Sequence, residues 1–206
     1  MYKILVLGSQ GSGKGTQADL LSEYFDIPAL SMGQLLRDEI ATGSELGQKI
    51  DGILKGGNLA STQDVAEVLK RRIGKEDAKN GYVLDGYPRS MDQFNSFDFD
   101  EPTHFILIDV PVEECVNRLG GRLTCNKCGK VYRIVDGYNN GDKCSACSGE
   151  LGKRHDESEE ALRRRLEIYE KDTKPVFDEY KKKGIFHLVD GAGTIEEVFG
   201  RVLNAL

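Results

Sequence analysis

One stretch near the N-terminus specifies the architecture of this 206-residue chain: Gly8-Ser-Gln-Gly11-Ser-Gly13-Lys14-Gly15-Thr16. It follows a short apolar run, Ile4–Leu7, and precedes apolar residues at helical spacing, Ala18, Leu21 and Tyr24. Glycines let the backbone fold into a nest of N–H groups, and the first turn of a helix adds partial positive charge. The stretch therefore predicts a phosphate-binding loop between a strand and a helix.

The side chains of this loop favour a nucleoside triphosphate with Mg²⁺ as its ligand. Lys14 offers a mobile ammonium to the β- and γ-phosphates, and Thr16 offers a hydroxyl close to the metal. The strict pattern has Ser or Thr directly after the lysine, whereas Gly15 stands there. The residues expected to bind ATP in this loop are Gly11, Ser12, Gly13, Lys14, Gly15 and Thr16. A phosphate loop alone does not distinguish a kinase from a hydrolytic switch or a motor.

Short apolar runs alternate with helical patterns along the chain, which predicts an α/β fold with a five-stranded parallel sheet. The expected strands are Ile4–Leu7, Ala29–Leu30, Tyr82–Leu84, Phe105–Ile108 and Phe186–Val189. The longest helical pattern runs from Ser158 to about Lys182, and Pro175 predicts a kink or a local break in it. Thr194-Ile-Glu-Glu197 predicts a capping box at the start of the last helix.

Two segments interrupt this alternation. Residues 31–60 have helical patterns and no strand, and residues 123–157 contain the paired cysteines and several turn signals. We expect both to be insertions, one helical and one β-rich. The core domain would then consist of residues 1–30, 61–122 and 158–206.

The composition disfavours several classes of partner. The chain has 28 basic and 34 acidic residues, so its net charge of −6 argues against nucleic acids and membrane surfaces as partners. No apolar run approaches the roughly 18 residues of a membrane span, and the N-terminus lacks a secretory signal. We expect a soluble cytoplasmic protein. A monomer is expected because one sheet and its helices use up the apolar patterns.

Four of the five cysteines predict a structural zinc site. Cys125 and Cys128 form one CxxC pair, Cys144 and Cys147 form another, and 15 residues separate the pairs. This spacing is typical of tetrahedral zinc, and four thiolates leave no open position for catalysis. Two local disulfides or free thiols are the alternative. The fifth cysteine, Cys115, is expected to be a buried small hydrophobic residue.

A second motif, Tyr82-Val-Leu-Asp85-Gly86-Tyr87-Pro88-Arg89, followed by Gln93, indicates what the loop does. It places Asp85 at the carboxyl end of a buried strand, the edge that faces the ligand in an open parallel sheet. Asp85 is suited to hold a water on Mg²⁺, and Arg89 is suited to clamp a second phosphate.

This motif and the Gly-Lys-Gly-Thr of the loop resemble the adenylate kinase family of the long-lid type, and the resemblance covers the whole chain. It implies the fold of P-loop nucleoside monophosphate kinases, in which residues 31–60 bind the acceptor nucleotide and residues 123–157 form a zinc lid. It also implies Mg²⁺-dependent, reversible transfer, ATP + AMP ⇌ 2 ADP, in adenine nucleotide homeostasis.

The resemblance also implies roles for individual residues. The catalytic residues would be Lys14, Asp85, Arg89, Arg122, Arg154 and Arg165. Beyond the loop, ATP would contact Arg118, Arg122 and Gly193. AMP would contact Met32, Arg37, Asn58, Ala60, Gly86, Arg89, Gln93, Arg154 and Arg165.

Four residues depart from the family's usual pattern, and one of them, Glu157, stands where a second aspartate is usual. Met32 replaces a threonine and Gln34 an aspartate, whereas Gln10 replaces a common proline and is expected to matter little. Met32 either relaxes selectivity for the acceptor base or packs beneath the site.

Two other functions remain open at this point. A UMP/CMP kinase or another nucleoside monophosphate kinase is one, although such relatives usually have short lids and asparagine at the position of Gln93. The other is a zinc-ribbon ATPase that binds nucleic acid. From Cys125 to Cys147, however, the chain has four basic and two acidic residues, and this excess of positive charge is small for a protein that binds a phosphate backbone.

Overall fold

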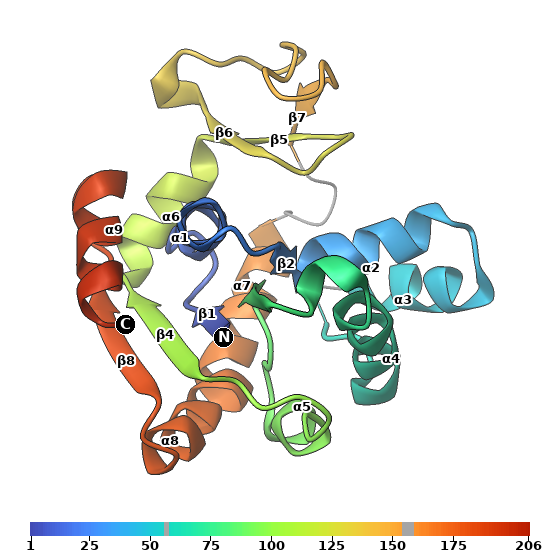
Figure 1. Cartoon of the computed structure of the whole chain (residues 1–206). Helices are drawn as coiled ribbons and strands as arrows, with labels where there is room; N and C mark the ends of the chain where they lie inside the picture. Colours follow the sequence, from blue (N-terminus) through green and yellow to red (C-terminus); the bar gives the residue numbers. More distant parts are fainter. Residues whose placement is uncertain (56–57, 154–158) are drawn as a thin grey trace.

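The computed structural model describes residues 1–55, 58–153 and 159–206 (Figure 1). Its main sheet has five parallel strands in the order β2-β3-β1-β4-β8. They are β1 (Tyr2–Leu7), β2 (Ala29–Ser31), β3 (Gly81–Asp85), β4 (His104–Asp109) and β8 (Phe186–Asp190). The predicted α/β fold and the positions of its five strands are confirmed.

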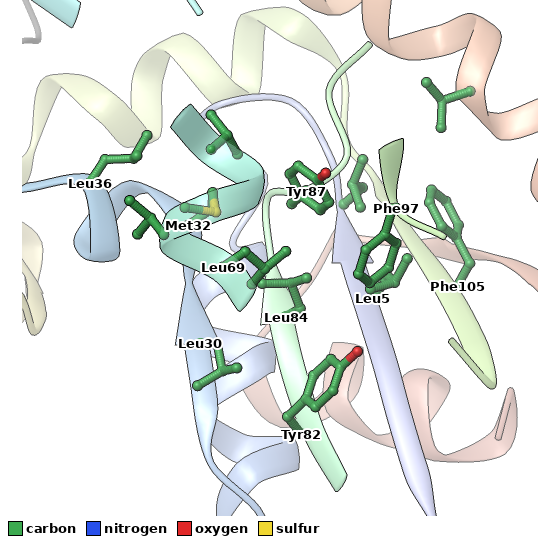
Figure 2. Close-up of a cluster of buried hydrophobic side chains, with 14 of the residues drawn as sticks. Leu5, Leu30, Met32, Leu36, Leu69, Tyr82, Leu84, Tyr87, Phe97 and Phe105 are labelled. Carbon is green, nitrogen blue, oxygen red and sulfur yellow. The ribbon is translucent and has the colours of Figure 1, made fainter. Parts of the chain in front are cut away.

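The strands are apolar without alternation because both faces of the sheet are buried. Along β1, Leu5 packs on one face, while Ile4 and Val6 pack on the other. Figure 2 shows part of the first face, where Leu5 lies with Leu84 and Phe105 from the neighbouring strands.

Helices cover both faces. They are α1 (Lys14–Phe25), α4 (Thr62–Ile73), α5 (Met91–Ser96), α6 (Val112–Gly120), α7 (Glu159–Ile168), α8 (Lys174–Lys182) and α9 (Ile195–Asn204). A short 3₁₀ turn, η1 (Glu76–Ala78), precedes β3. The capping box at Thr194 and Glu197 is confirmed, because each residue's side chain accepts from the other's backbone N–H.

Of the predicted kink or local break in the long helical pattern, the structure shows a local break. A π-helical segment, η3 (Tyr169–Thr173), separates α7 from α8. Pro175 occupies the first turn of α8. Proline lacks an N–H and crowds the carbonyl four residues earlier, so regular α-helical bonding ends before it.

The two interrupting segments contain the predicted kinds of structure. Residues 31–60 include α2 (Met32–Ala41) and α3 (Glu45–Lys55). In the region of residues 123–157 a small antiparallel sheet has the order β6-β5-β7. Its elements are β5 (Arg122–Cys125), β6 (Val131–Arg133), the 3₁₀ turn η2 (Ile134–Asp136) and β7 (Leu151–Gly152). Figure 1 shows this sheet at the top of the molecule and α2, α3 and α4 at its right.

The carboxyl ends of β1 and β3 meet side by side. Val6 is in register with Asp85, and the N–H of Gly86 donates to the carbonyl of Val6 at 3.1 Å. The loop after β1 and the motif after β3 therefore begin next to each other. Within the described parts of the chain, no helix combines the length and the apolar character needed to cross a membrane.

Candidate active site

The loop between β1 and α1 has the backbone that its glycines predict. Gly11 and Gly13 have φ values of 91° and 89°, in the region that disfavours side chains. A Cβ on Gly11 would also overlap the carbonyl of Cys115 on α6. Gly13 is the N-cap of α1, so the N–H groups of its first turn, from Lys14 to Thr16, lie at the end of the loop.

Asp85 faces the start of this helix. Its Oδ2 lies 3.6 Å from the position that a Cβ on Gly15 would take. Its Oδ1 is buried and has no hydrogen-bond partner among the described residues. Carboxylate and hydroxyl oxygens are the ligands that Mg²⁺ prefers, so Asp85 together with Thr16 suits that ion.

The side chains of Lys14 and Arg118 both donate to backbone carbonyls of the loop. Lys14 Nζ donates to the carbonyl of Ser9 at 3.3 Å. Arg118, on α6, donates to the carbonyl of Ser12 at 3.3 Å and to that of Gly191 at 3.1 Å. Arg118 therefore joins the loop to the segment after β8, which also contains Gly193 with a φ of 108°.

Arg89 is oriented by three neighbours. Its Nε donates to the carbonyl of Gly86 at 2.7 Å, and its backbone N–H donates to Oε1 of Gln93 at 2.8 Å. Its own carbonyl accepts from the hydroxyl of Thr173, in η3, at 2.8 Å. The Gln93 side chain is 3% exposed, and its oxygen is used to hold Arg89. Sequence reasoning missed Thr173, because no local pattern pairs residues 84 positions apart.

On α2, Gln34 holds Arg37. The Gln34 oxygen accepts from Nη2 of Arg37 at 2.9 Å and from its Nε at 3.3 Å, while its amide nitrogen donates to Asp38 at 2.7 Å. A neutral amide thus occupies the position where the family usually has a carboxylate, and it orients the guanidinium without cancelling its charge.

Met32 lies in the hydrophobic core. Its side chain is 3% exposed and belongs to the same cluster as Leu36, Leu69 and Leu84 (Figure 2). Ala60 is buried in this cluster as well. Asn58 lies apart from it and accepts from Nε of Arg164, on α7, at 3.4 Å.

Two arginines meet at Gln10 of the loop. With the Gln10 amide oxygen turned toward them, Nη1 of Arg165 donates to it at 3.1 Å and Nη2 of Arg122 donates to it at 3.3 Å. The structure therefore brings these two predicted residues together beside the phosphate loop. Arg154, the third predicted arginine of this group, lies outside the described residues.

The four paired cysteines converge. Their sulfurs all lie within 4.8 Å of one another, with 3.4 Å between Cys125 and Cys147 and 3.6 Å between Cys128 and Cys144. Tetrahedral zinc with bonds of about 2.3 Å separates its sulfur ligands by about 3.8 Å. This cluster therefore fits zinc. Cys115 lies elsewhere, fully buried beneath the loop, as expected.

The surroundings of Cys144 and Cys125 favour the thiolate, which is the metal-binding form, whereas burial raises the pKa of Cys128. The Tyr132 hydroxyl, 3.1 Å from the sulfur, lowers the pKa of Cys144 to about 6, and the Ala146 N–H also contributes. Burial raises the pKa of Cys125, but N–H groups of Cys128 and Lys127 outweigh it and leave that pKa below its ordinary value.

Comparison with known proteins agrees with this geometry. Residues 6–185 match the family model described as adenylate kinase. The chain is 39% identical over 211 residues to an adenylate kinase of Thermodesulfovibrio yellowstonii, covering 99% of this chain and 98% of the relative. It is 39% identical over 212 residues to one of Methanothrix thermoacetophila (98% and 97% covered) and 38% identical over 206 residues to one of Archaeoglobus fulgidus (97% and 95%). The matches extend over nearly the full length of the chain, and they agree with the phosphate loop, the neighbouring Asp85–Arg89 motif and the cysteine cluster. The chain belongs to the adenylate kinase family of phosphotransferases.

Proposed function

We propose that this chain catalyses the reversible, Mg²⁺-dependent reaction ATP + AMP ⇌ 2 ADP and thereby balances adenine nucleotides. The observation that carries the proposal is the adjacency of two phosphate-binding elements. The loop after β1 and the Asp85–Arg89 motif begin at neighbouring strand ends, joined by the hydrogen bond from Gly86 to Val6. Two nucleotides bound there would meet through their phosphates.

The proposed roles of the residues divide between the two nucleotides, ATP and AMP. The ATP phosphates bind the loop from Gly11 to Thr16, with Lys14 reaching the β- and γ-phosphates. Arg118 and the Gly193 segment flank the ATP base. The AMP phosphate binds Arg37 and Arg89. The remaining AMP contacts are Asn58, Ala60, Gly86 and Gln93, whereas Met32 packs beneath the site.

The chemistry is direct transfer, because no side chain needs to act as a nucleophile. An AMP phosphate oxygen attacks the γ-phosphorus of ATP, the bond to the β-phosphate oxygen breaks, and ADP leaves. Arg122, Arg154 and Arg165 offset the charge on the transferring group, and the enzyme gains rate chiefly from alignment and electrostatic stabilisation. Asp85 and Thr16 would hold Mg²⁺, which when bound would offset part of the phosphate charge.

We propose that two segments move during the cycle. Residues 31–60 bind AMP, and residues 123–157 form a lid shaped by zinc on the four cysteines. Both close on the core of residues 1–30, 61–122 and 158–206. Closure would exclude water from the transferring phosphoryl group and so suppress ATP hydrolysis.

A coupled assay of ADP formation tests the reaction. ADP should form from ATP and AMP with Mg²⁺, and hardly at all with ATP alone or with excess chelator. Lys14→Met should lower kcat on the order of 100-fold with an unchanged melting temperature, because its ammonium acts on the transferring charge. Lys181→Met, which removes an exposed lysine paired with Asp178, is the matched control and should be neutral. Near-normal kcat in Lys14→Met would refute the assignment of the loop.

A further inference from the structure

Gln10 connects the phosphate loop to both ends of the lid segment. With its amide oxygen turned toward the two arginines, the orientation that satisfies both ends of the amide, Gln10 accepts from Arg122 and Arg165 at 3.3 and 3.1 Å. Arg122 opens β5, directly before residues 123–157, and Arg165 lies on α7, directly after them. The two guanidinium groups therefore share one acceptor, which belongs to the loop itself.

Gln10 lies next to helices α6 and α7. Gly11 approaches the carbonyl of Cys115 too closely for any side chain, so the loop is held against α6. Gln10 also borders a cavity of about 280 Å³ between α6 and α7. The other residues that line this cavity are Val116, Leu119, Leu162, Arg163 and Leu166. Because the backbone next to Gln10 is held against α6, the side chain starts from a fixed point beside the two arginines.

We propose that Gln10 is a positioning residue that aims Arg122 and Arg165 at the transferring phosphoryl group; this rests on the proposed roles of those arginines. A neutral amide oxygen accepts from both guanidinium groups without itself neutralising their charge. Proline at this position offers no side-chain acceptor, and a carboxylate would form ion pairs that compete with phosphate. The glutamine is therefore not a neutral replacement for proline.

The test compares Gln10→Met with wild type, with Gln63→Met on the exposed surface of α4 as the matched control. Gln10→Met removes the acceptor of two hydrogen bonds and should lower kcat by at least about two- to tenfold, the effect of losing one of them, with little change in the KM for AMP. The loss should shrink in an Arg165→Met background, because Gln10 acts through that arginine. Unchanged kcat in Gln10→Met, or losses that multiply fully in the double variant, would overturn the proposal.

A second readout does not depend on catalysis. In nucleotide-free protein, amide hydrogen exchange at residues 122–125 and 159–168 should become faster in Gln10→Met and stay unchanged in Gln63→Met. Equal exchange in wild type and Gln10→Met would show that Gln10 does not hold these segments and would overturn the proposal. A chain that exchanges as expected but makes no ADP would instead refute the proposed function.

Discussion

The side-chain oxygen of Gln34 lies so close to Gly129 that a Cβ on this glycine would overlap it. Gln34 is on α2, while Gly129 lies in the loop between β5 and β6, next to Cys128. The same oxygen accepts the hydrogen bonds of Arg37. The contact thus joins the cysteine cluster of the lid segment to a proposed AMP-binding arginine.

Gly129→Ala should therefore raise the KM for AMP, roughly two- to tenfold, because the methyl group displaces Gln34 from Arg37. Gly137→Ala is the matched control, since Gly137 also has a positive φ (91° against 75°) but has nothing within 4 Å of a new Cβ. Both variants pay a similar backbone strain, so only the displaced contact distinguishes them. Steady-state kinetics with varied AMP measure the effect, and equal KM values in the two variants would contradict it.

The cysteine cluster predicts one Zn²⁺ per chain. Chelation should lower the melting temperature while the five-stranded sheet stays folded, because the described part of the lid segment has a small apolar core, in which Leu123, Tyr132 and Leu151 are buried beside the cysteines. Elemental analysis and thermal unfolding measure both effects. Cys144→Ser should lose the metal, whereas Cys115→Ser should keep it. Freshly purified, reduced protein without any transition metal would rule the site out.

Local patterns were sufficient to predict the five strands, the phosphate loop and the cysteine cluster. Each depends on residues close together in the sequence: glycines before a helix, an apolar run, two CxxC pairs. The contacts of Gln10 with Arg122 and Arg165, of Gln34 with Gly129 and of Thr173 with Arg89 could not be predicted in this way. They join distant segments, and tertiary packing alone determines where these side chains point.

The environment of Met32 also could not be predicted from local sequence patterns. The sequence left two interpretations open, a contact with the acceptor base or packing beneath the site, and its burial with Leu36 and Leu69 favours packing. Met32→Thr should lower the free energy of unfolding by about 2 to 4 kcal/mol, through a cavity and a buried hydroxyl. Met32→Leu, which keeps the volume, should cost less than about 1.5 kcal/mol. Denaturant titration measures both. A change in acceptor selectivity of Met32→Thr with unchanged stability would contradict the packing interpretation.

His104 predicts a pH dependence of stability. Partial burial and the stacked ring of His187, with centroids 5.9 Å apart, lower the pKa of His104 below its ordinary 6.5. The Tyr2 ring and the Thr103 hydroxyl are its other neighbours. The folded protein binds this proton less tightly than the unfolded chain, so stability is full above pH 6.5 and falls as the pH drops below it.

In His104→Gln this part of the acid-induced loss should disappear, so the stability of the variant should vary less between pH 7 and pH 5 than that of wild type. Denaturant titrations across this range measure the difference. Parallel curves for the two proteins would contradict the assignment of the loss to His104.

Acceptor selectivity tests the central claim most directly. With ATP and Mg²⁺, kcat/KM should be measured for AMP, GMP, CMP and UMP in one coupled assay. The account predicts that AMP is the preferred acceptor, with two ADP formed for each ATP consumed. A preference for a pyrimidine monophosphate, or consumption of ATP that no nucleoside monophosphate accelerates, would contradict it.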